Sequence, residues 1–177
     1  TNIPGLVVVK TKIYPDERGY FAETYNREAF KNAGFNFDFG VQDNQSESVL
    51  GTIRGLHCQW GEFSQAKLVR VVQGTVLDVA VDIRKNSPTF GQHYSIVLSD
   101  ENKFQLLISR GFLHGFAVLS KKATFAYKVD NKYNPKSEYS VRFDAPELNI
   151  DWRVPVNKMI VSDKEAKIGR ASCRERV

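Results

Sequence analysis

The sequence predicts an all-β protein built from short antiparallel strands. Runs rich in β-branched and aromatic residues are separated by clusters of Gly, Pro, Asn and Asp, the spacing of a β-sandwich or barrel. Apolar residues at helical spacing are almost absent. In the run 75–83, Leu77 and Val79 point to one face and Asp78 and Asp82 to the other, as the period of two in a strand requires. The first face is a core face, and the second, which mixes acidic with small apolar residues, suits a barrel interior that holds a polar ligand.

The other elements follow from the same pattern, taken along the chain. The runs predicted as strands are 5–12, 48–59, 66–73, 75–83, 92–98, 103–108, 114–119, 123–129 and 138–143. Turn signals fall at 74, 86–88, 109–111 and 134–135. One short helix is expected at 27–32, with Asn26 as its cap and Gly34 as its end. We therefore expect a cupin-type double-stranded β-helix (jelly roll) with one or two short helices.

Length and composition indicate a single domain. The chain has 177 residues, of which 42% are apolar and only 2 are Cys, so it can bury a sizeable core without disulfide or metal staples. The last ten residues continue no pattern that precedes them, and we expect one domain over 1–167 followed by a non-native tail over 168–177. No apolar run approaches the roughly 18 residues of a membrane span, and the first ten residues lack the layout of a signal peptide. A cytoplasmic protein without a membrane partner is expected.

The charge of the chain raises nucleic-acid binding as a possible function. The formal net charge is +5, but Lys, Arg, Asp and Glu are interspersed along the strands without a basic stripe. We therefore expect no nucleic-acid partner.

The densest group of chemically useful side chains is Arg54, His57 and Lys67. Arg54 and His57 have opposite strand parity, so they share a pocket only if the strand carries an extra residue, and Gly55 is where a bulge costs least. Taken alone, an exposed Arg and a hydrogen-bonded His on a half-buried strand explain the same residues, and Lys67 reads as one solvated charge among many.

The histidines of the chain do not suggest a metal site. His57, His93 and His114 stand alone, with no pair of His one residue apart. We expect no metal. A lone neutral His suits the role of base, because its unperturbed pKa of about 6.5 lets it accept a proton at neutral pH. His93 lies beside a turn and is expected at the surface.

Seven motifs carry a resemblance to a known family. They are DERGYFAE at 16–23, VQDNQS at 41–46, RGLH at 54–57, QAKLV at 65–69, DVAVDIR at 78–84, SPTFG at 87–91 and GFLHGF at 111–116. With these motifs in this order, residues 3–164 closely resemble the dTDP-4-dehydrorhamnose 3,5-epimerase family.

The resemblance implies a jelly-roll isomerase that needs neither metal nor cofactor. The family inverts C3 and C5 of dTDP-4-dehydro-6-deoxy-D-glucose and gives dTDP-4-dehydro-L-rhamnose. Both carbons lie α to the C4 ketone, so a base can remove each proton and an acid on the opposite face can return one. The alternatives are a relative that epimerises only C3 or only C5 of a nucleotide-linked 4-keto-6-deoxy sugar, and a non-catalytic sugar-nucleotide or metal-binding cupin. The latter would lack the motif His or Tyr, or carry a His-x-His pair, and neither feature is seen.

The family's pattern implies a role for each catalytic candidate. His57 is the base, Tyr127 is the proton donor, and Lys67 stabilises the enolate oxygen. Without the resemblance, Tyr127 reads as a strand Tyr packed in the barrel. The carboxylate that orients the family's base falls at Glu165 here, with Asp163 as the competing candidate.

Two further residues have open roles. Asp78 could tune the lysine or the histidine, or be an inward Asp satisfied by backbone donors. Cys58, next to the base, either reshapes the pocket or acts as a small buried hydrophobe.

The resemblance also implies how the nucleotide is held. A diphosphate and a thymine call for cations, amides and a stacking ring, and Tyr133 falls on the aromatic that stacks on thymine. The other residues that match substrate-binding positions are Arg18, Glu23, Gln42, Asp43, Asn44, Arg54, Lys67, His114, Glu138 and Lys164. In the family the segment around Arg18 reaches across from a partner subunit, so a homodimer is expected.

Overall fold

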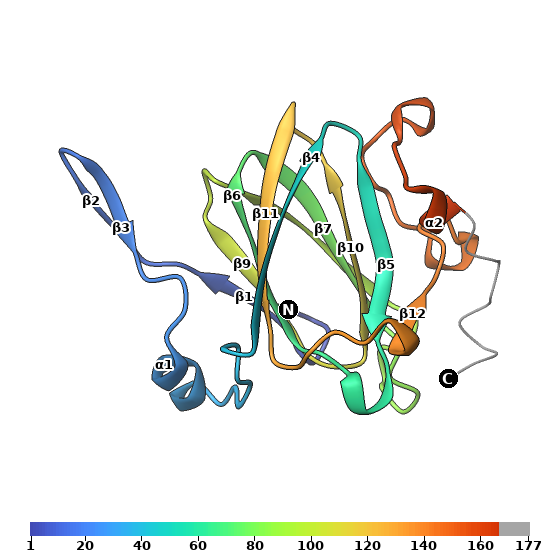
Figure 1. The fold of residues 1–177 in the computed structure, drawn as a ribbon, viewed down its shortest axis with the longest axis horizontal. Coiled ribbons are helices and arrows are strands. Elements are labelled where there is room, and N and C mark those ends of the chain that lie inside the picture. The colour runs from blue at the N-terminus through green and yellow to red at the C-terminus, as the bar shows by residue number, and fades with distance from the viewer. Residues whose placement is uncertain (167–177) are drawn as a thin grey trace.

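Two five-stranded antiparallel sheets face each other, and a two-stranded hairpin projects from them (Figure 1). The computed structural model describes residues 1–166, so the expected tail at 168–177 lies outside the described residues. The first sheet runs through β1 (Leu6–Lys10), β9 (Phe104–Ile108), β6 (Lys67–Gln73), β11 (Lys122–Val129) and β4 (Gln42–Val49). The second runs through β12 (Glu138–Ser140), β5 (Ile53–Gln59), β10 (Phe112–Val118), β7 (Thr75–Asp82) and β8 (His93–Ser99). The hairpin is β2 (Ile13–Asp16) with β3 (Gly19–Ala22).

Helical structure is limited to short elements. The α-helices are α1 (Arg27–Asn32) and α2 (Asp163–Ala166), and the 3₁₀ turns are Gly61–Phe63, Pro135–Ser137, Pro146–Leu148 and Val156–Lys158. The Asn26 side chain accepts a hydrogen bond from the Ala29 amide at 3.1 Å, so the predicted cap of α1 is confirmed. The predicted all-β class with one or two short helices is confirmed as well.

Two strand regions, β4 and the β2–β3 hairpin, lack the apolar alternation from which the other strands were predicted. β4 carries mostly polar residues, and it pairs along its whole length with β11 at the edge of the first sheet. Its half-buried residues include Asn44 and Ser46, which line a cavity described below rather than an apolar core, so the usual apolar alternation is missing. The hairpin of β2 and β3 is largely exposed and therefore also lacks a buried face.

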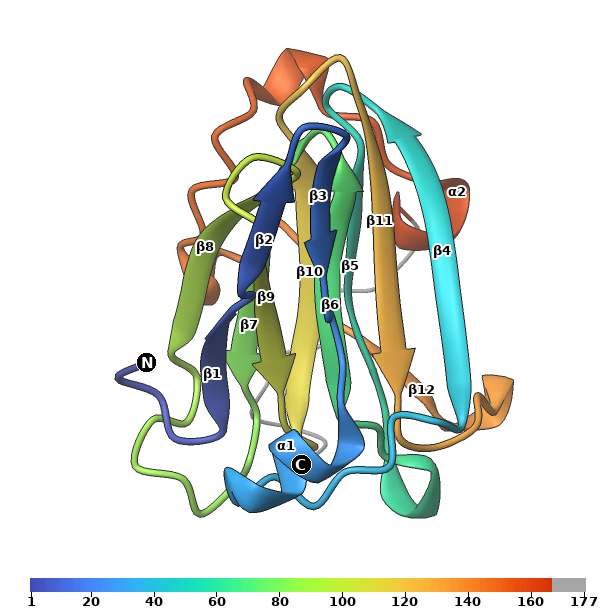
Figure 2. The ribbon, with the colours of Figure 1, turned by 90° about the vertical axis from the view of Figure 1, so that its left-hand side faces the viewer.

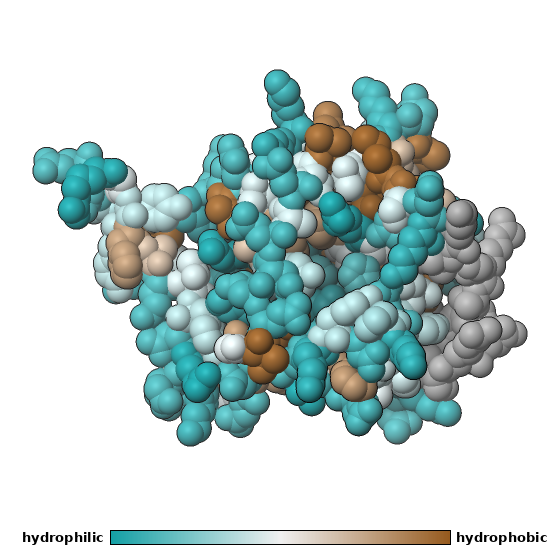
Figure 3. Space-filling model, in the orientation of Figure 1, coloured by the Kyte–Doolittle hydropathy of each residue, from teal (hydrophilic) through white to brown (hydrophobic). Residues whose placement is uncertain are grey.

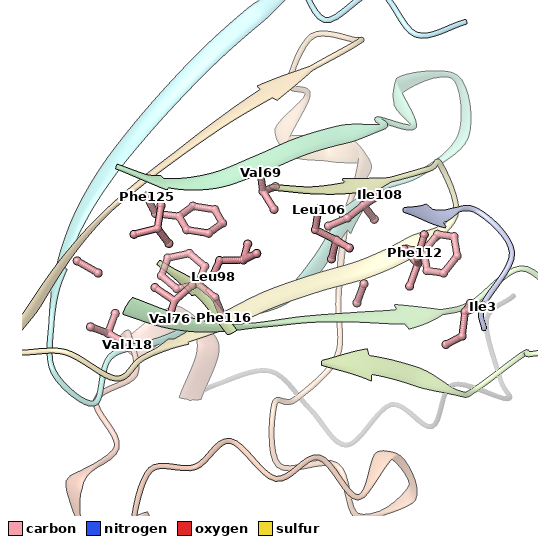
Figure 4. Packing of buried hydrophobic residues seen from close by; sticks show 14 residues of the cluster. Ile3, Val69, Val76, Leu98, Leu106, Ile108, Phe112, Phe116, Val118 and Phe125 are labelled. Atoms are coloured by element: carbon pink, nitrogen blue, oxygen red, sulfur yellow. The ribbon is translucent and has the colours of Figure 1, made fainter. Parts of the chain in front are cut away.

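The space between the sheets holds the main apolar core. Side chains such as Val69 of β6 and Phe125 of β11 meet Val76 of β7 and Phe116 of β10 there (Figure 4). The Phe116 and Phe125 rings stack with their centres 4.2 Å apart. This packing fixes the distance between the sheets next to the cavity.

The two faces of β7 divide as the alternation predicts. Leu77 and Val79 face away from the first sheet and pack in a second cluster with Leu148 and Trp152 of the C-terminal segment. Asp78, on the opposite face, is fully buried between the sheets. A third cluster places Phe30 of α1 over the outer side of the first sheet, where Leu68 and Leu107 lie.

The hairpin stands apart from this body. Figure 2 shows β2 and β3 on the side of the first sheet, and the projecting tip is hydrophilic in Figure 3. Within residues 1–166, no helix is long and apolar enough to cross a membrane.

Candidate active site

Two adjoining cavities open at one region of the barrel and share His57, Lys67 and Tyr127 in their walls. The inter-sheet cavity, of about 250 Å³, is otherwise lined by residues of β4, β5, β10 and β11, namely Asn44, Gln45, Ser46, Arg54, His114, Gly115, Phe116 and Phe125. The rim cavity, of about 210 Å³, adds residues nearer the C-terminus, among them Tyr133, Glu138, Ser162, Lys164 and Glu165. The shared residues therefore stand where one elongated ligand could occupy both spaces.

A β-bulge brings Arg54 and His57 to the same cavity. His114 of β10 pairs with His57, whereas Phe116, two residues on, pairs with Arg54, three residues back, so β5 carries one extra residue. Gly55 lies in this stretch with φ +113°, and a Cβ there would come within 2.5 Å of the His114 carbonyl oxygen. The bulge predicted at Gly55 is confirmed, and it is the reason for the shared orientation.

His57 is half-buried and surrounded by basic groups. Burial lowers its pKa well below the ordinary 6.5, and the nearby Lys67, His114, Lys164 and Arg54 lower the pKa further. The imidazole is therefore neutral at pH 7 and free to take a proton.

Lys67 begins β6 and is buried, with 6% of its surface exposed. Burial lowers the pKa of its ammonium, while Cys58, Asp78 and Glu138 act in the opposite direction and raise it. Its Nζ lies 6.0 Å from the centre of the Tyr127 ring. A cation is thus held in a desolvated place next to the other two shared residues.

Tyr127 lies on β11 in the first sheet, across from His57 on β5 in the second. Burial raises the pKa of its hydroxyl, although Arg54 acts to lower it. The phenol therefore keeps its proton at neutral pH.

The hydrogen bonds of Glu165 go to residues other than His57, the base that the resemblance implies it orients. Its Oε1 accepts a hydrogen bond from the Gly55 amide at 2.8 Å, and its Oε2 accepts from the amide and hydroxyl of Ser162 at 3.1 and 2.7 Å. Within residues 1–166, no side-chain hydrogen bond joins His57 to Glu165 or to Asp163, which is exposed on α2. Glu165 does line the rim cavity, and its part in catalysis stays a prediction.

Asp78 pairs with His114. The Asp78 Oδ2 atom lies 2.9 Å from His114 Nε2, and both side chains are buried. The open question about Asp78 is thereby answered in part, because the partner is neither the predicted base nor a backbone amide. This pair was not found from the sequence, since the two residues are 36 positions apart on neighbouring strands.

The candidates for holding the nucleotide gather at the rim cavity. The Tyr133 hydroxyl donates to Glu138 Oε2 at 2.7 Å, and the Lys164 ammonium donates to Glu138 Oε1. The Tyr133 ring is half exposed and free to meet a ligand. Lys164 thus joins Tyr133 and Glu138 from 26 residues beyond Glu138 in the sequence.

The remaining predicted binding residues are less centrally placed. Asn44 lines the inter-sheet cavity and accepts a hydrogen bond from Gln42 at 2.8 Å, while Asp43 pairs with Lys128. Gln42 and Asp43 line neither cavity. Arg18 and Glu23 also line neither.

Arg18 and Glu23 lie on and just after the hairpin. Arg18 pairs with Asp16 at 2.6 Å, and its side chain is 85% exposed. Glu23 accepts a hydrogen bond from Asn26 at 3.2 Å. This chain by itself does not bring the two residues to the cavities.

Two other residues singled out in the sequence have clear positions. Cys58 is a buried free thiol in the wall of the rim cavity, and burial raises its pKa to about 11, so it is uncharged. His93 is half-buried at the start of β8 and lines neither cavity. In the described part of the chain, no group of three or more His, Cys, Asp or Glu is arranged to hold a metal ion.

Comparison with known proteins identifies the family. Residues 1–171 match the family model described as dTDP-4-dehydrorhamnose 3,5-epimerase. The chain is 48% identical to the dTDP-4-dehydrorhamnose 3,5-epimerase of Shigella flexneri, over 93% of this chain and 90% of that protein. It also matches, with a TM-score of 0.89 and 47% identity, a 3,5-epimerase structure from Legionella pneumophila in complex with dTDP-4-keto-L-rhamnose, over 94% of this chain and 87% of that one.

A more distant solved structure has a related activity. It is a 3'-monoepimerase from Streptomyces bikiniensis in complex with dTDP-quinovose, which is 32% identical, has a TM-score of 0.88, and matches over 96% of this chain and 85% of its own. Because the family model matches residues 1–171 and the Shigella flexneri relative is 48% identical over most of both chains, the chain belongs to the dTDP-4-dehydrorhamnose 3,5-epimerase family.

Proposed function

We propose that this chain inverts C3 and C5 of dTDP-4-dehydro-6-deoxy-D-glucose by removing and returning a proton at each carbon, with dTDP-4-dehydro-L-rhamnose as product. The observation that carries the proposal is the position of His57, Lys67 and Tyr127 in the shared wall of the two cavities. The close relatives that bear the name of this activity support it.

His57 acts as the base. It takes the proton from the carbon next to the C4 ketone, and the electron pair of that C–H bond moves into the ketone to give an enolate. The low pKa of His57 supports this role, because the imidazole is unprotonated at neutral pH. A weak base can still act here, since the enolate is stabilised as it forms.

Lys67 is the group that stabilises the enolate. Its buried ammonium is a fixed cation in a desolvated site, where an interaction with a developing oxyanion is worth far more than in water. Proton transfer neither oxidises nor reduces the sugar, so this chemistry calls for no redox cofactor.

Tyr127 returns the proton from the opposite side. Inversion needs an acid and a base on opposite faces of the sugar, and Tyr127 and His57 come from the two facing sheets. The Tyr127 hydroxyl gives its proton to the carbon, the enolate electrons form the new C–H bond, and the ketone is restored. The resulting tyrosinate and imidazolium exchange protons with solvent before the second inversion.

The rim cavity holds the nucleotide. The exposed face of Tyr133 is suited to stack on thymine, and Lys164 and Arg54 supply cations for the diphosphate. Glu138 holds Tyr133 and Lys164 in place through its two oxygens. Asn44 and His114 face the sugar from the inter-sheet cavity, and Gln42 holds the Asn44 side chain by a hydrogen bond, while Asp43 pairs with Lys128.

A homodimer completes the site in this proposal. Arg18 and Glu23 line neither cavity of their own chain, and β3, which lies between them in the sequence, exposes Tyr20 and Phe21 at 57% and 67%. A projecting hairpin of this kind is suited to pack against a second copy and to carry Arg18 to its site.

We take 1–167 as one catalytic domain. We place it in the cytoplasm, since Cys58, the cysteine within the described residues, is a free thiol.

Solvent exchange tests the function directly. The wild-type chain, incubated with dTDP-4-dehydro-6-deoxyglucose in D₂O, is expected to place deuterium at both C3 and C5, as read by NMR or mass spectrometry. His57→Ala is expected to lose exchange at both carbons and to keep dTDP binding. His93→Ala is the matched control, because His93 lies outside both cavities. Deuterium at only one carbon would assign the chain to single-carbon epimerisation instead.

A further inference from the structure

Asp78 is a fully buried carboxylate for which the mechanism above has no use. It lies in the middle of β7, with 0% of its surface exposed, on the face between the two sheets. Its register partners are Phe116 on β10 and Ile96 on β8, both apolar. A charge at such a position is costly to bury and needs partners.

One oxygen of Asp78 is paired with His114, a residue that lines the inter-sheet cavity. Oδ2 lies 2.9 Å from His114 Nε2. A carboxylate only accepts hydrogen bonds, so the proton between the two groups belongs on Nε2. The His114 ring also stacks against Phe125 at 6.0 Å and 25°, which fixes its plane. An ionised Asp78 thus requires the tautomer of His114 with the proton on Nε2, which leaves Nδ1, without a side-chain hydrogen bond in residues 1–166, available to a ligand.

The other oxygen of Asp78 is buried and has no hydrogen-bond partner among the described residues. A second buried aspartate on the same strand, Asp82, differs from Asp78 in the hydrogen bonding of its carboxylate. Asp82 has both oxygens bonded, to Arg84, Ser87 and Thr89. Stability alone therefore does not explain Asp78, because a buried acceptor left unpaired costs stability.

The charged groups around Asp78 indicate which residues its carboxylate acts on. Lys67 on β6 is a buried cation, and the Asp78 charge raises the pKa of that ammonium. His114 on β10 is the hydrogen-bonded neighbour, and His57 on β5 faces both basic groups. The other titratable side chains in the walls of the two cavities are Cys58 and Arg54 of β5, Tyr127 of β11, Glu138 of β12, and Tyr133, Lys164 and Glu165 at the rim. Asp78 is the carboxylate on the inter-sheet side of the cluster.

We propose that Asp78 is a positioning residue for the epimerisation, one that fixes the proton of His114 on Nε2 and provides the fixed negative charge opposite Lys67. His114 Nδ1 then accepts a hydrogen bond from a sugar hydroxyl, and Lys67 stays charged opposite the C4 oxygen. The inference rests on the proposed function, since it assigns the ligand of this cavity as the sugar.

The first test needs no substrate. In the full chain labelled with ¹⁵N-histidine, the His114 signals are expected to show a protonated Nε2, and His114→Asn identifies those signals. An unprotonated Nε2 in the wild type would overturn the inference, whether or not the chain is an epimerase.

The second test is the rate of solvent deuterium exchange across pH for three variants. Asp78→Asn keeps the shape but removes the charge, and we expect exchange to slow on the order of ten- to a hundredfold, as when an orienting partner of a functional imidazole is lost. The alkaline limb of its pH profile is expected to move to lower pH, because Lys67 loses its proton more easily without Asp78. Asp78→Glu keeps the charge and is expected to keep the wild-type alkaline limb.

Asp82→Asn is the matched control, a loss of charge at an equally buried carboxylate on the same strand. It is expected to lower stability and to leave the exchange rate and its pH profile unchanged. An Asp78→Asn chain with the wild-type rate and alkaline limb would refute the positioning role. A wild type that exchanges at neither carbon would instead refute the proposed function, and the histidine spectra would still decide the Asp78–His114 arrangement.

Discussion

The Lys67 ammonium lies 6.0 Å from the centre of the Tyr127 ring, so a buried cation and a candidate proton donor share one wall of the cavities. The position is costly for the protein, because burial lowers the Lys67 pKa and so disfavours the charged form. A cost of this kind is expected where a charge serves function rather than stability.

Lys67→Met is therefore expected to separate activity from stability. Exchange at C3 and C5 should fall on the order of a hundred- to a thousandfold, the cost of removing one oxyanion-stabilising group. The melting temperature at neutral pH should stay the same or rise, because a desolvated charge is replaced by an apolar chain of similar length. Thermal unfolding and the exchange rate measure the two effects. A Lys67→Met chain that is both less stable and fully active would contradict the role.

The acid limb of the pH dependence of kcat/KM should reflect the protonation of His57. The pKa of His57 in the folded chain is well below 6.5, so kcat/KM for epimerisation should hold steady as pH falls through 6.5 and decline only at lower pH. The same shift affects stability, since the unfolded chain binds a proton at His57 that the folded chain does not. The free energy of unfolding should therefore fall as pH drops below about 6.5.

His57→Asn gives the control for that stability effect. The variant should show a weaker dependence of the unfolding free energy on pH in this window, as measured by denaturant titration. An acid limb centred at or above 6.5 would mean that a carboxylate supports the imidazolium of His57 after all.

Glu165→Gln distinguishes two roles for that carboxylate. The hydrogen bonds to Gly55 and Ser162 predict that the variant weakens the attachment of the C-terminal segment to β5. The acid limb of the pH profile should then remain where it is in the wild type. If Glu165 orients His57 instead, the limb should move to lower pH, because the imidazolium loses a favourable charge. Asp163→Asn, on the exposed side of α2, serves as the comparison and should change neither property.

Asp82 should contribute to stability at neutral pH and lose that contribution in acid. Hydrogen bonds from Arg84, Ser87 and Thr89 lower its pKa from 3.8 to about 2 against the opposing effect of burial. Because the folded-state pKa is the lower one, the stabilisation is full above about pH 4 and disappears as pH falls toward 2. Asp82→Asn should cost about 2 kcal/mol of unfolding free energy at pH 7. Urea titrations at pH 7 and pH 3 should show a smaller difference between variant and wild type at the lower pH.

Subunit mixing tests whether Arg18 acts on the partner's site. Arg18→Ala and His57→Ala are each expected to be impaired as homodimers. A mixed dimer contains one site with an intact His57 and an intact Arg18 from the other chain, so mixing and exchange of subunits should restore activity. Sedimentation analysis should show a dimer in every case. If mixing restores no activity, Arg18 does not act on the partner's site.

Several features of the fold could be predicted because they are decided over a few residues. The alternation in 75–83 follows from the geometry of a strand, and the start of α1 follows from the side chain of Asn26. The place of the bulge could be predicted on the condition that Arg54 and His57 share a pocket, because they have opposite parity and a glycine lies between them. β4 could not, since its inner residues face a polar cavity and the usual apolar signal is missing.

The sequence by itself thus determined the all-β class, the local turns, the family and the side chains present in its motifs. Only the tertiary structure decided which of those side chains meet. Asp78 and His114 are joined through the pairing of β7 with β10, and Glu165 reaches Gly55 from 110 residues away. Such contacts depend on strand order and register over the whole barrel, which no local pattern contains. For the same reason, the carboxylate expected beside His57 lies against a backbone amide, while the buried histidine–carboxylate pair forms one strand away.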